Sequence, residues 1–221
     1  MWDDGFRTTT LDALPVMKEV TELEMTLEDI ELGGHEHFML KEIFEQPAAM
    51  AELHAGRVNI SEGRIHLGGL VNLARELVNT KRFIITACGT AWHASLVGEY
   101  LFEDLRASPP RSNTPPSSAI ATRSSSRHAS SSPSASPARR ADTLAALREA
   151  QGQGALAIGV VNVVGSTIAR ETDAGIYLHV GPEIGVASTK AFIGQVLVLT
   201  LMARSTSAGG GIFPSRTSVP I

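Results

Sequence analysis

Apolar residues along the chain follow two spacings in turn, which predict strands and helices. Three short runs rich in β-branched and aliphatic residues are "RFIITA" at 82–87, "ALAIGVVNVV" at 155–164 and "GIYLHV" at 175–180. Such runs are typical of strands that are buried on both faces of a parallel sheet. Helical spacing occupies residues 91–105, 141–151 and 186–203. Because strands alternating with helices form βαβ units, we predict an α/β fold: a three-layer sandwich with a parallel sheet flanked by helices, incomplete in this chain.

An earlier segment, residues 37–56, also has helical spacing. One face of this predicted helix carries the apolar residues Phe38, Leu40, Ile43 and Phe44. Pro47 should interrupt the helix, because proline lacks the N–H that an interior helical position donates, and a second helix should begin there. Residues 70–77 show another short helical pattern.

Residues 107–141 break this rhythm. Ser, Pro, Arg and Ala make up 30 of these 35 residues, and Ile120 is the single large aliphatic residue among them. This composition buries too little apolar surface to offset chain entropy, so we expect the segment to be disordered. A linker between two domains does not fit, because the flanks each supply part of one sheet.

Composition and charge narrow the classes of function. A chain of 221 residues with 43% hydrophobic content is enough for one domain with a core, and a net charge of −4 gives no reason to expect nucleic acid. The longest apolar run, at 193–203, is too short to span a bilayer, so we expect no membrane partner. Cys88 is the one cysteine and the start "MWDDGFRTTT" has no signal-peptide pattern, so we expect a cytoplasmic protein. The "HEH" at 35–37 lacks further ligands, and we predict neither a metal nor a cofactor.

Longer stretches of the sequence carry a family resemblance. They are "GGHEHFMLKEIFEQP" (33–47), "ACGTAWHASLVGEYLFEDL" (87–105), "ADTLAALREA" (141–150), "NVVGSTIARETDAGIYLHVGPEIGVASTKAF" (162–192) and "QVLVLTLMA" (195–203). In them the chain resembles glutamine–fructose-6-phosphate aminotransferase (isomerising), the glucosamine-6-phosphate synthase family. The resemblance implies that residues 1–34 are the end of a glutaminase domain with its connector. It implies that residues 35–204 are the first sugar isomerase (SIS) domain, with a SIS-type sandwich, and that residues 205–221 are an aberrant tail.

The resemblance also suggests an origin for the Ser-rich segment. The family's phosphate loop "SQSGETADT" stands where this chain reads "SASPARRADT", and its "ASEFRYR" stands where this chain reads "PPSSAIA" at 115–121. With plausible GC-rich codons, reading either family stretch one base late gives the residues found here, without a change in length. We therefore interpret residues 106–140 as an out-of-frame translation, and the tail as a second loss of frame. On this interpretation the strands at 82–87 and 155–164 lose their neighbours, and we expect poor folding.

A set of substrate-binding residues is implied by the same resemblance. These residues are Cys88, Gly89 and Thr90 in the turn after the first strand, and Val186, Ala187 and Ser188 before the last helix. From the residues alone, Gly89 and Thr90 are better explained as a tight turn with a capping threonine, and Cys88 as a buried packing residue; the resemblance is what favours ligand binding. We assign no catalytic residue, because the family's catalytic cysteine, and the Glu, His and Lys that open the ring, have no counterpart here.

These implications lead to one expectation for function and leave two alternatives open. We expect a fragment of the enzyme that converts fructose 6-phosphate and glutamine to glucosamine 6-phosphate and glutamate. Such a fragment would be inactive alone, with fructose 6-phosphate or glucosamine 6-phosphate as ligand and a homodimer as the state of the intact family. The alternatives are a stand-alone SIS module that binds a sugar phosphate or regulates, and a non-enzymatic protein with a disordered Ser/Arg-rich tether.

Overall fold

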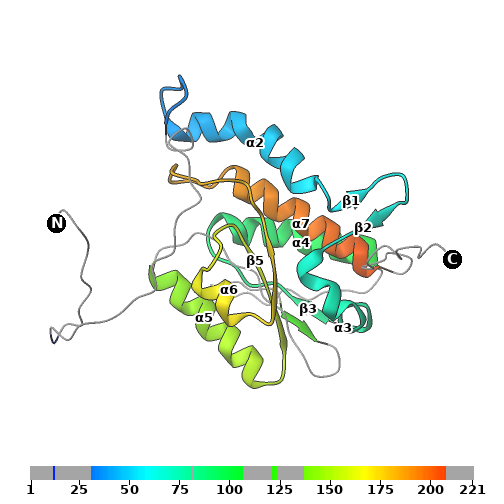
Figure 1. Ribbon diagram of the computed structural model, residues 1–221. Helices are drawn as coiled ribbons and strands as arrows, with labels where there is room; N and C mark the ends of the chain where they lie inside the picture. Colours follow the sequence, from blue (N-terminus) through cyan, green and yellow to red (C-terminus); the bar gives the residue numbers. More distant parts are fainter. Residues whose placement is uncertain (1–11, 13–30, 81, 107–120, 124–136, 208–221) are drawn as a thin grey trace. The chain divides into compact units, whose positions relative to one another are not determined.

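The computed structural model of the chain describes residues 12, 31–80, 82–106, 121–123 and 137–207 (Figure 1). The chain divides into two compact units, Met1–Glu31 and Leu32–Ile221. Nearly all of the described residues belong to the second unit, and the elements below are all part of it.

The second unit begins with helix α2 (Phe38–His54), which is continuous through Pro47. The expected break at Pro47 is therefore wrong. A proline at this position leaves the carbonyl of Ile43 without its helical donor. The side-chain amide of Gln46 takes that place, with Nε2 donating to the Ile43 oxygen at 3.1 Å. The helix thus keeps its carbonyl satisfied and runs on.

Short elements connect α2 to the main sheet. An antiparallel hairpin pairs β1 (Val58–Asn59) with β2 (Arg64–Ile65). A 3₁₀ helix, η1 (Gly68–Leu73), follows and leads into α3 (Ala74–Asn79). These two helices cover the predicted helical pattern at 70–77, and η1 packs against strand β6 of the main sheet.

The main sheet has the strand order β3-β4-β5-β6. Its strands are β3 (Arg82–Ile84), β4 (Ala121–Arg123), β5 (Leu156–Val161) and β6 (Ala174–Tyr177). β5 and β6 are parallel, with Val160 opposite Ile176, as the sequence predicts. β4 is antiparallel to both of its neighbours, so β3, β5 and β6 all run in one direction. The α/β class is confirmed, with one antiparallel strand inserted in the parallel sheet.

β4 lies within the segment that we expected to be disordered. It pairs with β3 through Phe83 and Thr122, and with β5 through Thr122 and Leu156. The expectation that β3 and β5 would lack neighbours is therefore wrong for these strands. Pairing supplies the backbone partners that two open strand edges would otherwise lack. The remainder of the predicted disordered segment, residues 107–120 and 124–136, lies outside the described residues.

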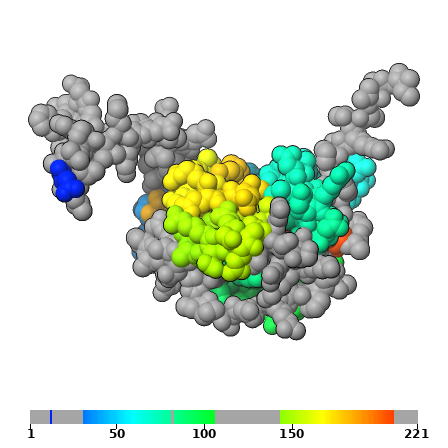
Figure 2. Space-filling view, turned by 90° about the horizontal axis from the view of Figure 1, so that it is seen from below, coloured from blue at the N-terminus to red at the C-terminus, as the bar shows by residue number. Residues whose placement is uncertain are grey.

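Helices lie on both sides of the sheet. α4 (Thr90–Arg106) and α7 (Lys190–Thr206) pack against each other, and α2 packs on α7. α5 (Pro137–Gly152) and α6 (Thr167–Glu171) contact β5 from the other side (Figure 1). Figure 2 shows α5 and α6 side by side, where Arg148 makes two hydrogen bonds of 2.8 and 2.6 Å to the Glu171 carboxylate. The last helix begins at Lys190 rather than at residue 186, so residues 186–189 are loop.

The core joins buried residues of the sheet to buried residues of α2, η1, α3, α4 and α7. Phe83 of β3 packs on Phe102 of α4 with ring centroids 4.8 Å apart, and both side chains are buried. Gly98 lets α4 approach α7, because a Cβ there would lie 2.7 Å from Cδ1 of Leu199. Burying this apolar surface is the main favourable term for the unit.

Candidate functional site at the carboxyl ends of the strands

Three chain segments leave the sheet at the same edge. Because β3, β5 and β6 run in one direction, their carboxyl ends meet there. The turn at Gly89 follows β3, residues 162–166 follow β5, and residues 178–189 follow β6. In α/β sheets ligands bind at this edge, where helix N-termini offer unpaired N–H groups.

The turn before α4 holds the first group of predicted residues. Gly89 has φ +61° and is exposed, and a Cβ built there would meet no atom of the described residues within 4 Å. The turn therefore faces open space, and its left-handed backbone conformation favours glycine. Thr90 is the first residue of α4, which has no acidic residue in its first turn. A long helix with no carboxylate at its start presents a positive dipole end to an incoming anion.

Cys88 is placed differently from its two neighbours. Its side chain is buried, with Sγ 3.5 Å from the hydroxyl oxygen of Thr143 on α5. A thiol in that position packs between the strand end and α5. The Cys88 thiol is therefore not part of the exposed surface of the turn.

The loop before α7 holds the second group. Val186 and Ala187 are exposed, and Val186 is 107% exposed relative to an extended chain. Ser188 is half-buried, and its hydroxyl donates to Oε2 of Glu183 at 3.0 Å. This hydrogen bond therefore stays within the loop and does not lead to the Gly89 turn.

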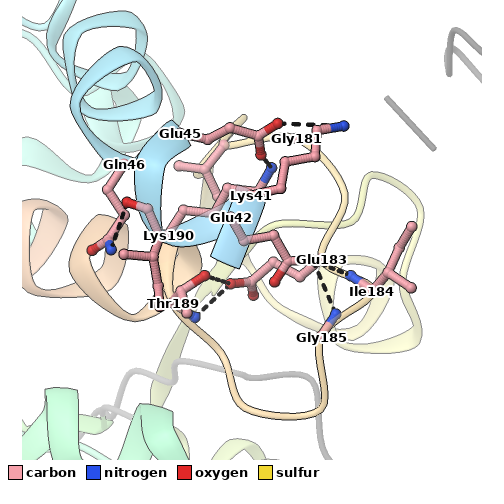
Figure 3. Close-up of polar contacts among 12 residues, drawn as sticks. Lys41, Glu42, Glu45, Gln46, Gly181, Glu183, Ile184, Gly185, Thr189 and Lys190 are labelled. Atoms are coloured by element: carbon pink, nitrogen blue, oxygen red, sulfur yellow. Dashed lines mark hydrogen bonds and ion pairs between the residues drawn. The ribbon is translucent and has the colours of Figure 1, made fainter. Parts of the chain in front are cut away.

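Glu183 caps the N-terminus of α7 (Figure 3). Its Oε1 accepts hydrogen bonds from the backbone N–H of Thr189 at 2.7 Å and of Ala191 at 3.3 Å. The Thr189 hydroxyl donates to the same oxygen at 3.3 Å. A carboxylate at a helix N-terminus is stabilised by the helix dipole. The start of α7 is therefore occupied by the protein's own anion, whereas the first turn of α4 itself carries no acidic residue.

An ion pair secures the first turn of α7 to α2. Lys190 is 5% exposed, and its Nζ lies 2.7 Å from Oε2 of Glu45. Burial acts to raise the pKa of Glu45, but the hydrogen bond and charge of Lys190, with the charge of Lys41, outweigh it and lower that pKa below its usual value. The Glu45 carboxylate is therefore ionised at neutral pH and holds the Lys190 ammonium.

Asn162 links the ends of β5 and β6. Its amide Nδ2 donates to the Gly181 carbonyl at 2.7 Å, and its Oδ1 accepts from the Val180 N–H at 3.2 Å. Two residues after β6, His179 has φ +53°, a conformation that non-glycine residues adopt uncommonly. The side-chain bonds of Asn162 fix the point from which the 181–189 loop departs.

Other features of the described residues do not form a second chemical site. A pocket of about 620 Å³ lies over the β1–β2 hairpin, where Asn59 accepts from Ser61 and Arg64 pairs with Glu62. Within the described ranges, no group of three or more His, Cys, Asp or Glu side chains could hold a metal ion, and His35 stacks on Phe44. Among these same residues, no helix combines the length and apolarity that a membrane crossing requires.

Comparisons with known proteins agree on one family. The family model described as "SIS domain" matches residues 135–205. The chain is 48% identical over 214 residues to the glutamine–fructose-6-phosphate aminotransferase (isomerising) of Chlorobaculum tepidum, covering 93% of this chain and 34% of that protein. It is 42% identical over 197 residues to the enzyme of the same name from Bacteroides thetaiotaomicron, covering 89% and 32%.

Over 93% of its own length the chain is homologous to about a third of the glutamine–fructose-6-phosphate aminotransferase (isomerising) sequence, and residues 135–205 match the SIS domain. A solved structure of the C-terminal domain of the Francisella tularensis glucosamine-fructose-6-phosphate aminotransferase superposes with a TM-score of 0.62 at 30% identity. That match covers 78% of this chain and 48% of the solved chain. The chain spans about a third of the length of the curated relatives it matches.

The sequence patterns did not identify three residues that shape the candidate site: Glu42, Asn162 and Glu183. Glu183 had a readable signal, since an acidic residue shortly before a helix start is a candidate cap. Asn162 follows a buried strand directly, which is a weaker signal of the same edge. Glu42 lies 142 residues from its loop partner, so no local pattern connects the two.

Proposed function

We propose that this edge of the sheet binds a hexose phosphate, fructose 6-phosphate or glucosamine 6-phosphate. The observation that carries the proposal is the difference between the two long helices that begin there. α7 has the Glu183 carboxylate against its first N–H groups, whereas α4 begins at an open glycine turn without an acidic residue. A phosphate is therefore favoured at Gly89 and Thr90 and disfavoured at α7.

The sugar part of the ligand then belongs to the other group of residues. Val186 and Ala187 are exposed and Ser188 is half-buried, and together they offer an uncharged surface with one hydroxyl and several backbone groups. Neutral hydrogen-bond donors and acceptors can bind the hydroxyl groups of a sugar, so charged side chains are not needed there. Cys88 contributes through its backbone alone, because its thiol faces Thr143.

Calorimetric titration of the purified chain tests this proposal. We expect fructose 6-phosphate and glucosamine 6-phosphate to bind and unphosphorylated fructose to bind far more weakly. Thr90→Val keeps the shape of the side chain and removes the hydroxyl. It should therefore weaken the binding of both sugar phosphates by about tenfold, the usual effect of losing one hydrogen bond to a charged group. Equal affinity for fructose and fructose 6-phosphate would contradict the assignment of the phosphate to α4.

We further propose that the chain alone does not make glucosamine 6-phosphate. General acid–base chemistry needs titratable groups within hydrogen-bond reach of the sugar. Neither predicted group supplies one: the residues are Cys88, Gly89, Thr90, Val186, Ala187 and Ser188, and the Cys88 thiol is buried. The test is incubation with fructose 6-phosphate and glutamine, or with ammonia, followed by product detection. Formation of glucosamine 6-phosphate would refute this part of the proposal.

The interpretation of residues 106–140 as an out-of-frame segment also remains a proposal, as does the homodimer expected for the family. Two separate stretches shift by the same base without a change in length, which supports the out-of-frame interpretation. Resequencing the gene across codons 100–145 and beyond codon 203 tests that interpretation. Light scattering of the purified chain tests the homodimer. If resequencing gives the same bases, an error in the gene sequence is excluded, and the Ser-rich segment is a real part of the chain.

A further inference from the structure

A buried carboxylate on α2 holds the loop that carries Val186. Glu42 is 3% exposed, and its Oε1 accepts hydrogen bonds from the backbone N–H of Ile184 at 2.6 Å and of Gly185 at 2.9 Å (Figure 3). A buried charge is costly unless it is hydrogen-bonded, and here the bonds go to backbone donors of a loop that has no sheet partner. The contact therefore fixes the loop to α2.

Two carboxylates hold the loop at its two ends, one on α2 and one in the loop itself. Glu42 holds residues 184 and 185, and Glu183 holds the Ser188 hydroxyl and the Thr189 N–H. Val186 and Ala187 lie between these fixed points and are exposed. Their position follows from the two carboxylates, because neither side chain packs against the core.

Gly185 is shaped for this contact. A Cβ there would lie 2.8 Å from Oε2 of Glu42 and 3.3 Å from Cα of Met39. Any side chain at this position would push the loop away from α2. Oε2 of Glu42 is itself buried without a hydrogen-bond partner among the described residues, so one oxygen makes both bonds. A glutamine can present an equivalent oxygen, whereas an alanine cannot.

We propose that Glu42 is a positioning residue for the sugar-binding loop. It sets the backbone of residues 184–185, and through it the placement of Val186, Ala187 and Ser188, without contacting the ligand. The inference rests on the proposed function, since it assumes that these loop residues meet the sugar of a hexose phosphate.

The test compares Glu42→Ala, Glu42→Gln and a control, Glu52→Ala, which changes an exposed glutamate on the same helix. In the ligand-free chain, amide hydrogen exchange of Ile184 and Gly185 should be slow in the wild type and in Glu52→Ala. It should be at least about tenfold faster in Glu42→Ala, because the hydrogen bonds that protect both amides are lost. Glu42→Gln should retain most of the protection.

Binding separates a positioning role from a merely structural one. Glu42→Ala should weaken the binding of fructose 6-phosphate by about 10- to 100-fold, as expected when charge-assisted hydrogen bonds that order the site are lost. The affinity for inorganic phosphate should not change, because phosphate is assigned to the α4 turn. Glu42→Gln should recover affinity to within a few-fold of the wild type. If Glu42→Ala does not fold, Gly185→Ala leaves the carboxylate in place and should give the same pattern.

The outcomes distinguish the two proposals. If the wild type binds no hexose phosphate, the proposed function fails, and unchanged amide exchange in Glu42→Ala would separately overturn the loop contact. If the wild type binds and Glu42→Ala binds equally well, the positioning role is overturned and the function stands. Equal losses of affinity for fructose 6-phosphate and for inorganic phosphate would show a general structural role, and would also overturn the positioning role.

Discussion

The substitution Gly69→Ala tests how η1 is packed on the sheet, and its neighbour Gly68 offers a matched control. A Cβ built at Gly69 would overlap the carbonyl oxygen of Gly175 in β6 and lie 3.1 Å from its carbon. The obstacle is backbone, so no side chain can rotate away, and η1 or β6 must move. Overpacking costs about 1–3 kcal/mol, and a backbone obstacle places this change near 3. Among the described residues, a Cβ at Gly68 would meet only Nε2 of His66, at 3.6 Å, an ordinary contact.

Thermal and urea unfolding of the full chain, followed by far-ultraviolet circular dichroism, provide the measurement. For a domain of this size about 1 kcal/mol corresponds to about 2–4 °C in Tm, so Gly69→Ala should lower Tm by about 6–12 °C. Gly68→Ala should lie within about 0.5 kcal/mol of the wild type or be slightly more stable, since alanine favours helix over glycine. Equal stabilities for the two variants would refute the close approach of η1 to β6.

Three further predictions concern the residues around α7 and the buried thiol. Glu183→Ala should lower the free energy of unfolding by about 1–2 kcal/mol, the usual cost of a lost cap with its charge–dipole term, and Glu183→Gln by less; urea titration that ranks them in reverse would contradict the capping role. Because the folded-state pKa of Glu45 is lowered, its contribution to stability is present above the unfolded pKa near 4.5 and is lost as pH falls through the lower value. Glu45→Gln should therefore flatten the dependence of stability on pH below about pH 5, and an unchanged slope would show that the Lys190 pair adds nothing. Cys88, which is 7% exposed, should react with a thiol reagent only as fast as the chain opens, and immediate labelling in native buffer would disprove its burial.

Local spacing predicts the elements of this fold well because each element's own residues decide them. The run at 155–164 gives β5, and the helical spacing at 91–105 gives α4. Two helix starts differ from the positions that the spacing predicts: α5 begins at Pro137 and α7 at Lys190. Proline is suited to a first helical turn, and Glu183 caps the start of α7, so both boundaries have a physical cause.

The strand-end turn at Gly89 was predictable for the same local reason. A buried strand followed by glycine and a helix predicts a tight turn, and the positive φ of Gly89 agrees with it. The insertion of β4 was not predictable, because residues 121–123 have no apolar run. Their pairing depends on the open edges of β3 and β5, which lie far away in the sequence.

Helix α2 shows why sequence patterns missed the residue that we assign to loop positioning. The apolar residues Leu40, Ile43 and Phe44 suggest one buried face, yet they are 39%, 41% and 67% exposed. The buried residues are instead Glu42, Ala49 and Leu53. Their spacing of seven and then four residues is that of a single core-facing stripe. A glutamate on such a stripe violates the binary pattern of a packed helix, and the hydrogen bonds to Ile184 and Gly185 are what offset its burial. A charged residue that occupies a core position of a helix therefore indicates a polar partner on another element, and in this chain the partner is the loop at the candidate site.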